Sequence, residues 1–249
     1  MAPHLTDIEY EEPFNSALEQ IQIGIDQCVE KFNELVAQVN EWRWLLGPIA
    51  LWWIKGKLQS VRDGLQVIID KVKYALDHQI PVLSLITTSF RWVREVKTPA
   101  SDLSFMTTEP ADENLAKWTG DAASAYHSKA GKQKAAVDET VVKAEFISQW
   151  LFKIAKANVD YAVELAKIVT GLAGKLTQAA IDAATVIDIP WAIDTLAKMV
   201  GDLVTAGLNQ LLTIGERFVD ALGNVRDIAT QVGDHSKLPG GNWPEAVRG

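Results

Sequence analysis

Residues 14–46 read FNSALEQIQIGIDQCVEKFNELVAQVNEWRWLL, and this stretch decides the fold. Its apolar side chains recur at alternating steps of four and three residues: Phe14, Leu18, Ile21, Ile25, Cys28, Phe32, Leu35, Val39 and Trp42. A repeat of about 3.5 residues predicts a helix whose apolar stripe lies along another helix, as in a coiled coil. Cys28 falls within this stripe, so we interpret it as a small buried apolar residue and not as a reactive thiol.

A second apolar stripe follows directly after Gly47-Pro48, a pair that ends one helix and suits the start of the next. The stripe consists of Leu51, Ile54, Leu58, Val61, Leu65, Ile68, Val72 and Ala75. Two such helices joined by a short break predict an antiparallel helical hairpin.

The rest of the chain also has helical periodicity. Pro81 interrupts the second helix, a third helical piece covers about 82–96, and residues 97–111 are predicted to form an irregular connection because of their proline and turn residues. Helical spacing resumes at Asp121 and continues to 187, and a last helix is expected over about 190–232.

No segment has the pattern of a strand, so the predicted fold class is all-α: an elongated bundle of long antiparallel helices. The sequence divides into two halves near the irregular connection. Residues 1–98 form a helical hairpin plus a third helix, and residues 99–249 form two long helices and a flexible C-terminal tail.

Composition excludes several classes of protein. The 249 residues are 48% hydrophobic, carry a net charge of −8 and contain a single cysteine, so an internal disulfide is impossible. Lys and Arg are not clustered apart from acids, which argues against a nucleic-acid partner. The acidic start lacks the basic and apolar regions of a signal peptide, so any export is expected to be leaderless, after synthesis in the cytoplasm.

No constellation of residues points to catalysis. His4, His78, His127 and His235 do not have metal-ligand spacing, and the chain contains no phosphate-binding loop, dinucleotide fingerprint or nucleophile elbow. We therefore expect no catalytic residue, no metal and no cofactor, and we do not expect an enzyme.

Two segments leave alternatives open. The tryptophans at 42, 44, 52 and 53 crowd the first predicted turn, where they either close the end of the bundle or form a sticky tip for a partner or a membrane. Residues 168–187 are mainly apolar and long enough to span a bilayer, but they contain Lys175 and Asp182. We favour a buried bundle helix, and membrane contact is the less favoured alternative.

The remaining distinctive stretch is WTGDAASAY, residues 118–126. Gly120 permits a sharp turn, and Asp121 is expected to be the N-cap of the helix that follows. The small side chains of Ala122 and Ala123 would let another helix approach closely. Trp118 and Tyr126 lie two turns apart, so we expect both to reach one groove.

The spelling W-x-G-x-A-A-x-x-Y resembles the WXG motif of the WXG100-like proteins, which are all-helical substrates of the type VII (ESX) secretion system of actinobacteria and firmicutes. The layout, with a helical hairpin, a proline-containing connection and then WxG and a long helix, is similar to that of the longer actinobacterial members. The resemblance covers roughly residues 99–165 by motif and 14–96 by layout. Small members place WxG in the turn between two helices of similar length, whereas here only about 112–117 can form helix before the motif.

The resemblance implies a non-enzymatic protein that is exported folded and acts through protein–protein interaction. Its partners would be a helical WXG100-like protein or a second copy, together with the secretion ATPase. Trp118 and Gly120 would form the recognition element, and Ala122, Ala123 and Tyr126 would shape the groove beside it. The family's YxxxD/E export signal is absent, so a partner would supply it. The alternatives are the targeting domain of a larger type VII toxin and a membrane-active α-helical protein.

Overall fold

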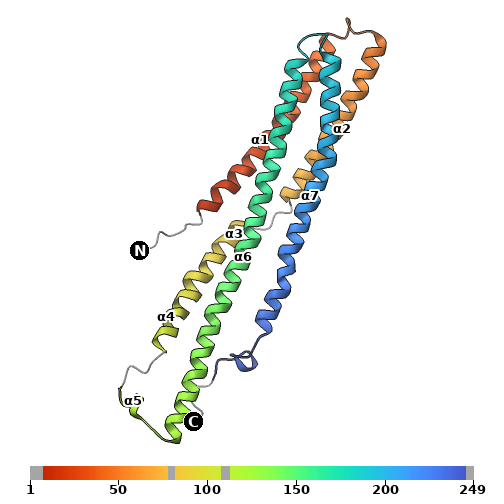
Figure 1. The fold of residues 1–249 in the computed structure, drawn as a ribbon. Helices are drawn as coiled ribbons and strands as arrows, with labels where there is room; N and C mark the ends of the chain where they lie inside the picture. Colours follow the sequence, from red (N-terminus) through yellow and green to blue (C-terminus); the bar gives the residue numbers. More distant parts are fainter. Residues whose placement is uncertain (1–7, 78–81, 108–112, 245–249) are drawn as a thin grey trace. The chain divides into compact units, whose positions relative to one another are not determined.

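The computed structural model describes residues 8–77, 82–107 and 113–244, and within these ranges it contains helices and no strand (Figure 1). The elements are α1 (Ile8–Glu41), α2 (Pro48–Asp77), α3 (Val82–Arg91), the π-helix η1 (Trp92–Lys97), α4 (Thr98–Met106), α5 (Glu113–Lys117), α6 (Asp121–Asp182), α7 (Ile189–Gly233) and the 3-10 turn η2 (Pro239–Gly241). The predicted all-α class is confirmed for the described residues, and Pro81 lies outside them.

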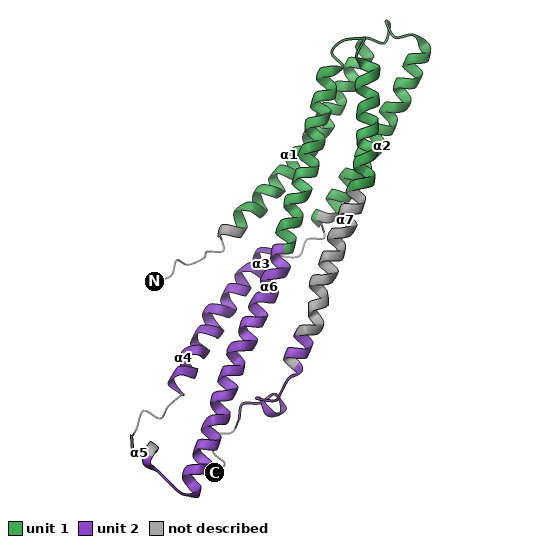
Figure 2. Ribbon diagram, viewed as in Figure 1, with its two compact units in different colours: residues 1–80, 157–218 green, residues 81–156, 219–249 purple. Residues whose placement is uncertain are grey.

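The chain forms two compact units, each built from two separate segments (Figure 2). Unit 1 contains residues 1–80 and 157–218, and unit 2 contains residues 81–156 and 219–249. The boundaries between the units therefore fall inside α6 and α7, and each of these helices contributes to both units. The division predicted from the sequence instead runs along the chain, into contiguous halves.

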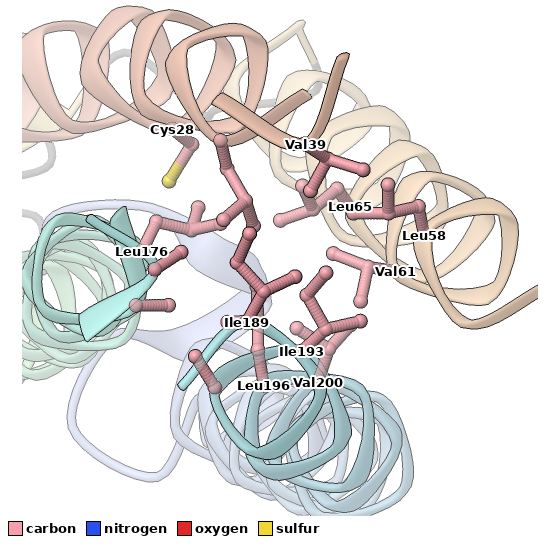
Figure 3. Close-up of a cluster of buried hydrophobic side chains, with 14 of the residues drawn as sticks. Cys28, Val39, Leu58, Val61, Leu65, Leu176, Ile189, Ile193, Leu196 and Val200 are labelled. Carbon is pink, nitrogen blue, oxygen red and sulfur yellow. The ribbon is translucent and has the colours of Figure 1, made fainter. Parts of the chain in front are cut away.

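Unit 1 is a helical bundle in which α1, α2, α6 and α7 share one apolar core (Figure 3). Both apolar stripes predicted from the sequence contribute to this core: Cys28, Leu35 and Val39 from the first stripe, and Ile54, Leu58, Val61 and Leu65 from the second. The buried members of the first stripe are Phe14, Ile21, Ile25, Cys28, Leu35 and Val39, and those of the second are Ile54, Leu58, Val61, Leu65 and Val72. Leu172, Leu176, Ile189, Ile193, Leu196 and Val200 complete the core from α6 and α7.

Segment 168–187 belongs to this core over most of its length. The side chains of Leu172, Leu176 and Ala179 are buried among the other helices, as expected for a bundle helix. No helix within the described ranges is long and apolar enough to span a bilayer. The helix is also shorter than predicted, because α6 ends at Asp182 and turns connect it to α7.

Cys28 is 1% exposed, and its Sγ lies 3.9 Å from the carbonyl oxygen of Val169 on α6. The predicted buried position is therefore confirmed. Burial disfavours the thiolate and raises the pKa of Cys28 from the ordinary value of 9.0 to about 11.

This shift predicts a loss of stability at high pH. Between about pH 9 and pH 11 the unfolded thiol ionises while the folded thiol stays protonated, so ionisation favours unfolding. Below about pH 9 the thiol is protonated in both the folded and the unfolded state, so the free energy of unfolding is not lowered by its ionisation. Relative to Cys28→Ala, the parent protein should lose about 2 kcal/mol of unfolding free energy by pH 11. Urea titrations of both proteins across this range measure the difference, and a difference that does not change with pH would contradict the prediction.

The prediction of an irregular connection over 97–111 is wrong for residues 98–106, which form α4. A proline inside an α-helix lacks one N–H donor and clashes with the carbonyl four residues earlier. Pro99 lies in the first turn of α4 directly after the wider π-helix η1, where Thr98 donates its N–H to Val93, five residues back. The π turns thus accommodate the proline without ending the helix. Residues 108–111 of this connection lie outside the described ranges.

Candidate recognition site

A short turn between α5 and α6 carries the WxG motif in unit 2. Helix α5 covers Glu113–Lys117, as the sequence predicts for the short piece before the motif. The N–H of Trp118 donates to the carbonyl oxygen of Leu115 at 3.3 Å, which closes the last turn of α5. The chain then reverses direction through Gly120 and enters α6.

Gly120 has a φ of +104°, a backbone conformation that residues with a Cβ rarely adopt. Its carbonyl oxygen accepts the N–H of Ser124 at 3.0 Å and the Ser124 hydroxyl at 3.2 Å. Gly120 therefore occupies the N-cap position, and the predicted capping role of Asp121 is wrong. The residue before the helix has a positive φ, which glycine tolerates and aspartate does not. Asp121 is therefore the first helical residue, and its negative charge interacts favourably with the positive end of the helix dipole.

Trp118 and Tyr126 come together across this turn, as their spacing predicts. Their ring centroids are 5.8 Å apart with an interplanar angle of 50°, and the centroid of the His127 ring lies 5.5 Å from that of Tyr126. Both aromatic side chains remain about 40% exposed: 41% for Trp118 and 42% for Tyr126. They form an ordered pair on the surface, which gives a partner two aromatic contacts already fixed in position.

The five residues of the motif do not all lie on one surface. Trp118, Gly120, Ala122 and Tyr126 are exposed, whereas Ala123 is buried. Adjacent helical residues point about 100° apart, so Ala122 and Ala123 cannot share a face. Ala123 therefore serves the packing of α6, and the sequence did not indicate that His127 joins the aromatic pair.

The first half of α6 is held to α3 and η1 by polar and aromatic contacts within unit 2. The buried hydroxyl of Ser148 donates to the carbonyl oxygen of Ser89 at 2.8 Å, and Lys97 pairs with Glu145 at 3.0 Å. Phe90 and Phe152 pack edge to face at 6.0 Å between centroids. These contacts hold α6, the helix that carries Tyr126, to its neighbours in unit 2.

Further polar contacts join α6 to α4 and to the end of α7. Lys134 pairs with the carboxylate of Asp138 at 2.7 Å, and the Ser104 hydroxyl donates to the same carboxylate. Lys134 first and Ser104 second hold the pKa of Asp138 below its usual value. Lys143 donates to the carbonyl oxygens of Gln231 and Asp234, each at 2.7 Å. Such a cation satisfies carbonyls that the last helical turn leaves unpaired. No cluster of three or more candidate metal ligands occurs within the described ranges.

A second exposed apolar surface lies at one end of unit 1. The predicted tryptophan cluster divides: Trp42 and Trp53 pack against the core, whereas Trp44 and Trp52 are 75% and 77% exposed. The cluster therefore closes the bundle with only half of its side chains. The other two do not close the bundle: Trp44 lies in the connection after α1 and Trp52 lies on α2, and both side chains are exposed.

Comparisons with known protein families, with curated proteins and with solved structures find no match for this chain. The surfaces and contacts of its described residues therefore carry the functional argument.

Proposed function

We propose that this chain is a non-enzymatic helical protein that a type VII secretion system of actinobacterial type exports in folded form. The proposal rests mainly on one observation, the ordered Trp118–Tyr126 pair beside the Gly120 turn. Recognition of a folded substrate needs a fixed surface element, and an aromatic pair at a rigid turn meets this need at little entropic cost.

The proposal includes the elongated, antiparallel arrangement of helical hairpins typical of such substrates. It assigns recognition to Trp118 and Gly120, with Ala122 and Tyr126 on the surrounding surface and Ala123 as packing support. A helical WXG100-like partner or a second copy of the chain supplies the YxxxD/E signal. The secretion ATPase binds this signal together with the recognition element at Trp118 and Gly120. The apolar side chains of α4 fit a helical partner, since Leu103, Phe105 and Met106 are all exposed.

Export in an actinobacterial host with a type VII system tests this proposal. The parent protein should appear in the culture medium, and deletion of the secretion ATPase should abolish its appearance. Trp118→Ala should reduce the amount in the medium by at least about tenfold, because a central aromatic contact typically contributes more than 1.4 kcal/mol. Immunoblots of medium and cell lysate measure both fractions.

The matched control is Trp243→Ala, which removes a tryptophan of similar exposure, 50%, from another part of unit 2. It should leave export unchanged. Equal levels of the Trp118→Ala protein inside cells separate a defect in recognition from a defect in folding. Export that continues without the ATPase would remove the proposal.

A further inference from the structure

We draw no further inference here: the strongest candidate, the exposed apolar surface patch at the end of unit 1 that carries the α1–α2 and α6–α7 connections, with Trp44, Ile49, Trp52, Ile187 and Trp191, carries nothing, because both acids and bases border it and nothing in the structure shows what covers it.

Discussion

Replacing Leu176 with alanine is expected to lower the free energy of unfolding by about 2–5 kcal/mol. Leu176 has no exposed surface, and its side chain lies in the centre of the core that α1, α2, α6 and α7 share (Figure 3). Alanine removes three buried carbon atoms and leaves a cavity. Helices held by side chains from all directions cannot move in to fill it, so both the transfer free energy and the packing energy are lost.

Denaturant unfolding followed by circular dichroism measures this effect. The matched control is Ile181→Ala, a truncation of an aliphatic side chain on the same helix that is 62% exposed. Its cost should stay within about 1 kcal/mol, because most of that side chain is already in water. Similar losses for the two variants would show that the shared core does not hold unit 1 together.

Gly64→Ala should destabilise the protein by about 1–3 kcal/mol, although alanine is the better helix former. A Cβ at position 64 of α2 would lie 2.5 Å from Cγ1 of Val200 on α7. Val200 is 1% exposed and β-branched, so it has little freedom to rotate away. Gly56→Ala on the same helix meets nothing within 4 Å and should stabilise the helix by about 0.5–1 kcal/mol.

A double-mutant cycle isolates the contact between positions 64 and 200. Val200→Ala alone should cost about 2 kcal/mol, since it opens a cavity in the core. Together with Gly64→Ala the new methyl group enters that space, so the double variant should be at least about 1 kcal/mol more stable than the sum of the single effects. Strict additivity would mean that α2 and α7 do not pack as closely as this contact requires.

The parts of the fold that could be predicted from the sequence depend on local periodicity. The stripes of α1 and α2 were correct because a helix buries the positions that recur every three or four residues, whatever it packs against. Helix α4 was missed because proline normally ends a helix, and the π turns that accommodate Pro99 leave no compositional signal. Pairing of residues 1–80 with 157–218 is a long-range choice that periodicity does not encode.

Prediction of the exposed surface sites from the sequence is limited in the same way. The approach of Trp118 to Tyr126 was predicted from their short separation in the sequence, although Trp118 lies in the turn before α6 and not on the same helix as Tyr126. The exposure of Trp44 and Trp191 was not predictable, because it depends on how helices distant in the sequence pack around each residue. The exposure of a tryptophan also depends on which side of a turn it occupies, and amino-acid composition does not determine that side.

The composition of unit 1 from two distant segments has a consequence for synthesis. The ribosome makes α1 and α2 long before α7, yet Ile193, Leu196 and Val200 of α7 are needed to close their core. Until residue 200 has emerged, two apolar stripes have no complete partner and stay available for chaperones or for premature association. Folding of the bundle is therefore expected to be a late, largely post-translational event, and a chain stalled within α6 would expose its most aggregation-prone surfaces.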